Sequence, residues 1–314
     1  NDLKDKIIRC VGNPDTRFNE DALRILRALR FASVYGFSIE ENTSKSIFKN
    51  ADLLKNIATE RVISEFLKLI CGKDAVKILD AYRETIAVII PEITAMFNFN
   101  QNNIHHSYDL WRHTLTALGT IEPNPILRMT MLLHDIGKPF VKTTDNSGQS
   151  HFQGHQLESK KIADKILHRL RLPSDFINKT LLLIEYHDVR FNGSKKLMKK
   201  VMNVLGTDLT KQLLEVEYAD ISAQSEYQRE EKLGYLKNAK THLNEIIKDN
   251  ECFKLSQLDI NGKDVLNLGV KEGRDVGNIL DYLLMLVVDA NGPNKKSILI
   301  SKAEEYIYGN QINK

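Results

Sequence analysis

The chain has little cysteine, little proline and no long hydrophobic run. Its three cysteines, Cys10, Cys71 and Cys252, lie far apart and form no Cys-x-x-Cys pair. This usage favours a reducing compartment over a disulfide framework. No apolar run reaches the length of a membrane span, and the N-terminus shows no signal-peptide pattern. The sequence therefore predicts a cytoplasmic protein without a membrane segment.

Strand-like patterns are also scarce. Only 7 prolines interrupt the 314 residues, and long stretches with a 3.6-residue apolar period dominate, so the fold is predicted to be all-α. The length favours two or three domains. A formal charge of +3 is too small to argue for a nucleic-acid partner, for which only local clustering of charge could speak.

The most informative stretch lies near the middle of the chain. An apolar run over residues 126–133 leads directly into His134 and Asp135, and Gly137 follows. A buried histidine beside an aspartate is costly unless both side chains bind something. A divalent cation is a partner that imidazole and carboxylate can share. The alternative is a core histidine that is hydrogen-bonded by its neighbour.

Further candidate ligands lie on both sides of this pair, each on or beside a predicted helix. They are His113 upstream and His155, His187 and Asp220 downstream. The order His, His-Asp, His, His, Asp resembles the HD superfamily of metal-dependent phosphohydrolases. This resemblance implies that a divalent ion, Mg²⁺, Mn²⁺ or Ni²⁺, is held by His113, His134, Asp135 and Asp220.

The same resemblance implies roles for three further side chains. His155 and His187 would hold a second metal or contact the substrate phosphate. Lys138, three residues after Asp135, would reach a phosphate near the metal, so that His134, Asp135 and Lys138 form the catalytic set. The alternative for Lys138 is a solvated surface lysine. His105 and His106 are expected to shape the rim of the site and not to bind metal.

The N-terminal region contains a strong helix signal over residues 21–32. Asn19 is a candidate N-cap, the apolar stripe is Ala22, Ile25, Leu26 and Leu29, and the helix is expected to end near Gly36. In isolation, the charges at its start read as exposed pairs of Arg24 with Glu20 and Asp21, which stabilise a helix weakly.

Residues 12–32 resemble the neck helix of bacterial tRNA nucleotidyltransferases, the CCA-adding enzymes of the poly(A) polymerase family. The resemblance implies that Asp21 and Arg24 read the Watson–Crick edge of incoming CTP or ATP, with Arg17 and Arg27 near phosphates or the neck–head junction. It also implies tRNA as a partner. The family's polymerase head should carry an Asp-x-Asp pair, and this chain has none. We therefore expect a region without the catalytic head, unable to transfer nucleotides by itself.

These observations predict three parts: a neck and body over residues 1–95, an HD domain over 96–225 and a helical tail over 226–314 that contacts tRNA. Two other hypotheses stay open. The chain could be a free-standing HD nucleotide phosphohydrolase, or a non-catalytic RNA-binding module. Lys195, Lys196, Lys199 and Lys200 fall on one helical face, which favours a solvated surface over an RNA contact.

Overall fold

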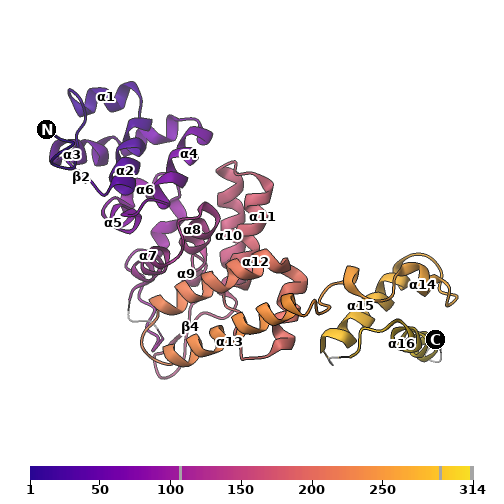
Figure 1. Cartoon of the computed structure of the whole chain (residues 1–314). Coiled ribbons are helices and arrows are strands. Elements are labelled where there is room, and N and C mark those ends of the chain that lie inside the picture. The colour runs from indigo at the N-terminus through magenta and orange to yellow at the C-terminus, as the bar shows by residue number, and fades with distance from the viewer. Residues whose placement is uncertain (106–107, 290–291, 312–314) are drawn as a thin grey trace. The chain divides into compact units, whose positions relative to one another are not determined.

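The computed structural model describes residues 1–105, 108–289 and 292–311, and it is almost entirely helical (Figure 1). His106, which was expected at the rim of the site, lies outside the described residues. The all-α prediction is confirmed. The chain divides into two compact units, residues 1–189 with 212–233 and residues 190–211 with 234–314. No helix in the described part of the chain is long and apolar enough to cross a membrane. The three-part division stays a prediction.

The first unit contains the neck-like region and the histidine-rich region. Its helices up to the middle of the chain are α1 (Pro14–Glu20), α2 (Leu23–Tyr35), α3 (Glu41–Asn50), α4 (Thr59–Ile70), α5 (Ala75–Ala81) and α6 (Arg83–Ala87), with 3-10 turns η1 (Ala51–Asn56) and η2 (Pro91–Met96). Those that follow are α7 (Leu110–Thr120), α8 (Pro125–Leu133), α9 (Lys138–Val141), α10 (His155–Arg169) and α11 (Ser174–Tyr186). Two short pairs of strands join loops: β1 (Ile7–Ile8) runs parallel to β2 (Ser38–Ile39), and β3 (Thr143–Thr144) runs antiparallel to β4 (Ser150–His151).

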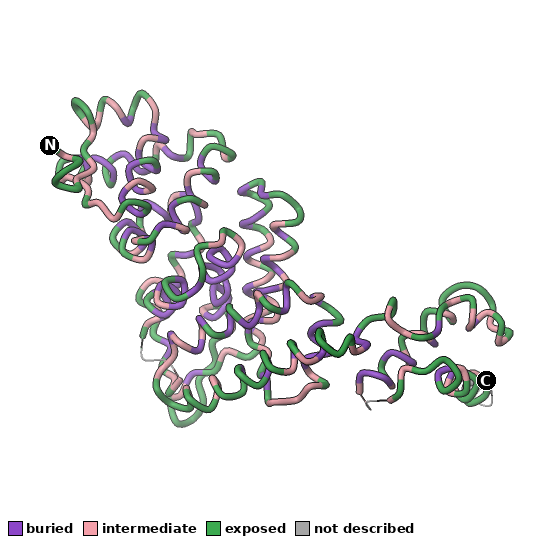
Figure 2. The backbone as a smooth tube through the Cα atoms, in the orientation of Figure 1, coloured by how far each residue is buried: buried purple, intermediate pink, exposed green. Residues whose placement is uncertain are grey.

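Helix α2 lies at the centre of the N-terminal half of this unit and packs on α4. Its predicted apolar stripe is buried, with Ile25, Leu26 and Leu29 fully covered, and the helix ends at Gly36 in the left-handed conformation. Figure 2 shows buried backbone concentrated in this region and around α8. Burial of such stripes is the main stabilising contribution to a helical fold.

The predicted start of this helix was wrong. Asn19 lies inside α1 and is no N-cap; the cap is Asn13, whose side chain accepts from Thr16 N, with Pro14 at the first helical position. Proline is favoured there because its missing N–H has no partner in the first turn. The chain turns at Asp21, whose Oδ1 accepts a hydrogen bond from Leu23 N at 3.1 Å, and α2 begins.

The second unit holds the first half of α12 (Lys195–Ala223), most of α13 (Arg229–Lys248), η3 (Leu255–Gln257), α14 (Gly262–Leu266), α15 (Arg274–Asp289) and α16 (Lys296–Gln311). Its core is formed by the apolar faces of α14, α15 and α16. Gly206 interrupts α12 with φ 71° and ψ 174°, a conformation that strongly favours glycine.

The solvated lysine face predicted in α12 was wrong in one respect. Lys199 is buried, and its Nζ lies 2.8 Å from Glu251. Lys195 also pairs with Glu251, while Lys196 and Lys200 pair with Asp289. Because these ammonium groups are paired inside their own unit, they are poor candidates for a contact with an RNA backbone.

Candidate metal centre

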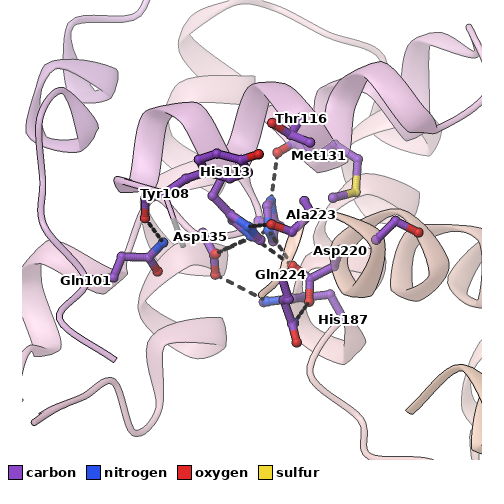
Figure 3. A network of polar contacts seen from close by, with 12 residues as sticks. Gln101, Tyr108, His113, Thr116, Met131, Asp135, His187, Asp220, Ala223 and Gln224 are labelled. Carbon is purple, nitrogen blue, oxygen red and sulfur yellow. Dashed lines mark hydrogen bonds and ion pairs between the residues drawn. The ribbon is translucent and has the colours of Figure 1, made fainter. Parts of the chain in front are cut away.

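Five helices of the first unit deliver the histidines and aspartates that the sequence singled out. His113 lies in α7, His134 and Asp135 follow α8, His155 begins α10, His187 follows α11, and Asp220 lies near the end of α12. The packing of α8 on α7 and α11, and of α10 on α11, holds four of these elements together. Figure 3 shows His113, Asp135, His187 and Asp220 pointing toward one another.

One group consists of the four residues predicted as metal ligands. His113 Nε2 lies 2.9 Å from Asp220 Oδ1 and 3.4 Å from Asp135 Oδ2. His134 Nε2 lies 3.3 Å from Asp135 Oδ2 and 3.5 Å from Asp220 Oδ1. One ligand atom from each residue falls within 4.8 Å of all the others. Two imidazoles and two carboxylates thus surround a single point.

A second group shares Asp135 with the first. Its Oδ1 lies 3.3 Å from His155 Nε2 and 3.6 Å from His187 Nε2, and the three ligand atoms again fall within 4.8 Å of one another. The two oxygens of Asp135 therefore face different groups, Oδ2 toward His113 and His134 and Oδ1 toward His155 and His187. This arrangement places one carboxylate between two possible ion positions.

The outer nitrogen of each of these four imidazoles is held by a backbone carbonyl. His134 Nδ1 donates to Met131 O at 2.7 Å, His155 Nδ1 to Phe152 O at 2.9 Å, His187 Nδ1 to Ile184 O at 2.6 Å and His113 Nδ1 to Ala223 O at 3.3 Å. Since a carbonyl only accepts, the proton of a neutral ring sits on Nδ1 in His134, His155 and His187. His113 has an acceptor on each side, because its Nε2 also lies 2.9 Å from Asp220 Oδ1. All four Nε2 atoms face inward, where a bound ion would take the place of any proton on them.

The interior of the centre contains polar atoms without a satisfactory partner. Among the described residues, His134 Nε2 and Asp135 Oδ1 are buried and accept no well-angled hydrogen bond, and His155 Nε2 faces His187 Nε2 at 3.1 Å. Buried unsatisfied atoms of this kind cost stability, and two facing lone pairs repel. A divalent cation would satisfy all of them, and the mixed imidazole and carboxylate donor set suits one. The residues present therefore fit a metal ion.

The electrostatics follow from the carboxylates of Asp135 and Asp220. Burial by itself lowers the pKa of His134, but the two carboxylates outweigh it and raise the pKa to about 10 when no ion is bound. A divalent ion would therefore replace a proton on His134 Nε2. Burial and the carboxylates Asp220 and Asp188 raise the pKa of Glu217 well above its usual value. The centre thus concentrates negative charge that only cations can neutralise, which is the condition for holding a divalent ion.

Lys138 is buried and is no solvated surface lysine. Its Nζ lies 2.7 Å from Asp135 Oδ2 and donates to Gln101 Oε1 at 3.2 Å, and only 5% of the residue is exposed. On the other side of the centre, Gln224 Nε2 donates to Asp220 Oδ2 at 2.8 Å. The ammonium group therefore lies against a ligand of the candidate centre, and its contact with a phosphate stays a prediction.

Three residues that contribute to the centre were missed by sequence reasoning. Gln224 follows Asp220 by four positions, so helical spacing could have indicated that their side chains meet. Glu217 precedes Asp220 by three positions and carried the same signal. Gln101 comes from the polar segment before α7, and nothing in its sequence neighbourhood indicated a place beside Lys138.

The residues expected to face the nucleotide lie elsewhere in the same unit. Asp21 Oδ2 accepts from Arg61 Nη2 of α4 at 3.2 Å, while Arg17 pairs with Glu20. Arg24 forms neither pair expected for an exposed helix, and its Nε is buried without a partner among the described residues. Arg27 is exposed. The structure therefore leaves the Asp21 and Arg24 roles as predictions and adds Arg61 as the residue that holds Asp21.

Fold and site together define an all-helical protein that carries a histidine and aspartate centre. Two family models match the chain: "Probable RNA and SrmB- binding site of polymerase A" over residues 36–97 and the tRNA nucleotidyltransferase domain 2 model over residues 155–303. The CCA-adding enzyme of Ligilactobacillus salivarius is 28% identical over 98% of this chain and 65% of its own length. The CC-adding tRNA nucleotidyltransferase of Thermus thermophilus is 29% identical over 84% of this chain and 62% of its own length.

The fold has a solved counterpart. The CCA-adding enzyme of Bacillus stearothermophilus in complex with CTP matches 100% of this chain and 68% of its own, with a TM-score of 0.69 and 21% identity. Over most of its length the chain is similar to tRNA nucleotidyltransferases. It spans less than two thirds of the length of the two curated relatives.

Proposed function

We propose that the histidine and aspartate centre is a metal-dependent phosphohydrolase site that acts on phosphate esters at the 2′ and 3′ positions of nucleotides or RNA 3′ ends. The observation that carries this proposal is the convergence of four imidazole Nε2 atoms on the carboxylates of Asp135 and Asp220. When bound, a divalent ion such as Mn²⁺, Ni²⁺ or Mg²⁺ supplies Lewis acidity and lowers the pKa of water.

The chain's own residues have separable tasks in this proposal. His113, His134 and Asp220 hold the first ion together with Asp135, and His155 and His187 hold a second ion or the phosphate. The carbonyl bonds to Nδ1 fix the orientation of each ring. Lys138 supplies a positive charge 2.7 Å from Asp135, which stabilises the negative charge that builds on a phosphoryl group during transfer.

The test combines metal analysis with turnover. We expect purified chain to contain divalent metal and to hydrolyse 2′,3′-cyclic AMP when Mn²⁺, Ni²⁺ or Mg²⁺ is present. Asp135→Asn should remove both properties, because it changes a ligand of both groups. Asp164→Asn, an exposed change in α10, serves as the matched control. Metal-free protein that is inactive across this panel would sink the proposal and favour a module that only binds RNA.

We also propose that residues 1–95 select CTP and ATP, and that the tail over residues 226–314 holds tRNA, as part of CCA addition in the cytoplasm. The two family-model matches and the names of the relatives support this second function. The contact of Arg61 with Asp21 supports it further, because a half-buried carboxylate held by an arginine keeps a fixed direction for a nucleobase edge.

Binding of CTP and ATP to the chain tests this part directly. Asp21→Asn keeps the oxygen that accepts from Leu23 N but loses the negative charge. We expect it to weaken CTP binding by about tenfold or more, since a hydrogen bond to a charged group contributes roughly 1.5–3 kcal/mol. Asp52→Asn, an exposed change in η1, is the control. Unchanged binding in Asp21→Asn would remove the template role and favour a free-standing phosphohydrolase.

A further inference from the structure

A cavity of about 740 Å³ opens in the first unit. Its walls are the segment 98–104, Tyr108 with Asp109, and the loop 147–149 that joins β3 to β4. Four asparagines and one glutamine contribute to this lining. The volume is in the range of sites that take a small molecule, and no residue of the lining has been given a function above.

The composition of the walls defines the chemistry that the cavity can accept. Lysine and arginine are absent from the described lining, and its single charged residue is Asp109, so an anion is disfavoured inside it. Amides offer donors and acceptors side by side, the arrangement that reads the edge of a nucleobase. Tyr108 adds an aromatic side chain that is 46% exposed, on which a base can stack.

Several of these polar groups are not used by the fold. Among the described residues, the amides of Asn98 and Gln149 and the hydroxyl of Tyr108 make no hydrogen bond to the protein. Other amides build the wall itself: Asn102 Nδ2 donates to Gly148 O at 2.5 Å, and Asn103 Nδ2 donates to Ser150 O at 2.8 Å. The cavity therefore combines a fixed frame with groups that are available to a ligand.

A short chain of contacts connects the cavity to the centre. Gln101 lies within the segment that contributes to the lining, and its Nε2 donates to Tyr108 O at 3.3 Å (Figure 3). Its Oε1 accepts from Lys138 Nζ at 3.2 Å. Lys138 in turn lies 2.7 Å from Asp135. A phosphate beside Lys138 is thus only one side chain away from the wall of the cavity.

We propose that this amide-lined cavity seats the uncharged nucleoside part of a phosphorylated substrate while its phosphate lies at the metal centre. The inference rests on the proposed phosphohydrolase function and names its substrate class: a nucleotide, whether free or at the 3′ end of an RNA. The cavity supplies the selectivity for a nucleoside that the charged centre by itself lacks.

Two measurements on the full chain test the cavity and the hydrolase separately. The first is binding of adenosine and cytidine, which have no phosphate, to metal-free protein by saturation-transfer NMR. The second is the ratio of the KM for 2′,3′-cyclic AMP to the KM for bis(p-nitrophenyl) phosphate in the Mn²⁺-loaded protein. The double variant Asn98→Gly/Gln149→Ala removes two unused amides; glycine is chosen at position 98 because Asn98 has φ 55°. Asn42→Ala on the exposed face of α3 is the control.

We expect the native chain and the Asn42→Ala variant to bind nucleosides, and the double variant to lose that binding and to raise the KM ratio about tenfold. Nucleoside binding that is lost in the double variant supports the cavity proposal, whether or not the chain hydrolyses a phosphate ester. Absence of hydrolysis would refute only the hydrolase proposal. Absent nucleoside binding, or an unchanged KM ratio in an active enzyme, overturns the cavity proposal. An oligoribonucleotide ending in a 2′,3′-cyclic phosphate, compared with cyclic AMP, distinguishes RNA ends from free nucleotides.

Discussion

A divalent metal should stabilise the folded chain strongly, and Asp135→Asn should abolish this stabilisation. The ligands come from five helices, and His113 and Asp220 are 107 positions apart in the sequence. The unfolded chain cannot bring such ligands together, so the ion binds the folded state selectively. Metal binding is then directly coupled to the free energy of unfolding.

The magnitude follows from mass action. At a free metal concentration of 100 times Kd, selective binding adds about 2.7 kcal/mol to the free energy of unfolding. One kcal/mol corresponds to roughly 2–4 °C in Tm for a unit of this size. We therefore expect Tm to rise by about 5–10 °C when Mn²⁺ is added to chelator-treated protein. Asp135→Asn removes the negative charge that both groups of metal ligands share, so the rise in Tm with Mn²⁺ should disappear.

Differential scanning calorimetry with and without Mn²⁺ measures this shift. Asp164→Asn changes an exposed carboxylate with the same chemistry and should retain the full rise. An equal rise in Asp135→Asn and in the native chain would mean that the ion binds elsewhere. No rise in any variant would show that the inward lone pairs are satisfied by protons, and the metal centre would be refuted.

Three further changes give distinct outcomes. Gly137→Ala places a Cβ 2.5 Å from the α10 backbone and should lower the free energy of unfolding by about 1–3 kcal/mol. Gly234 has open space around it, so Gly234→Ala should change the free energy of unfolding by no more than roughly 1 kcal/mol. Urea denaturation compares the two variants. Glu251→Gln leaves the buried Lys199 without its carboxylate and should lower the free energy of unfolding by about 2 kcal/mol in the same assay. Breaking a fully buried pair costs roughly 3–5 kcal/mol, and the loss here is smaller because the Glu251 side chain is 25% exposed. Hydrogen bonds from a lysine, a serine and an asparagine of α3 lower the pKa of Asp15 to about 2. Its stabilising effect is therefore present above the unfolded pKa of about 3.9 and lost as the pH falls through 2, so Asp15→Asn should flatten acid unfolding followed by circular dichroism between about pH 4 and 2.

The parts of the fold that were predictable are those governed by local periodicity. The stripe of α2 and its end at Gly36 follow from a 3.6-residue repeat and a residue that accepts positive φ. The start of α2 was not predictable in this way, because Pro14 begins a separate helix that includes Asn19. Two adjacent helices with one polar turn between them resemble a single capped helix when only the sequence is read.

The candidate centre was predictable as a set of residue types and not as a geometry. The order of histidines and aspartates indicated which residues meet, because five different helices carry or precede them. The partners of those residues come from distant segments: Gln101 reaches Lys138 across 37 positions, and Arg61 reaches Asp21 across 40. Long-range polar contacts of this kind have no local sequence signal and depend on how the helices pack.

The turn after α8 carries two adjacent residues that serve one centre. His134 keeps helical backbone angles, with φ −57° and ψ −37°, and neighbours in this conformation point about 100° apart. The ends of the two side chains still meet, with His134 Nε2 3.3 Å from Asp135 Oδ2. Gly137 lets the backbone of α10 approach, because a Cβ there would lie 2.5 Å from Ser159 N, and its N–H donates to Ser159 Oγ at 2.9 Å. The same turn therefore joins the two ligands and brings α10, with the second group of histidines, against them.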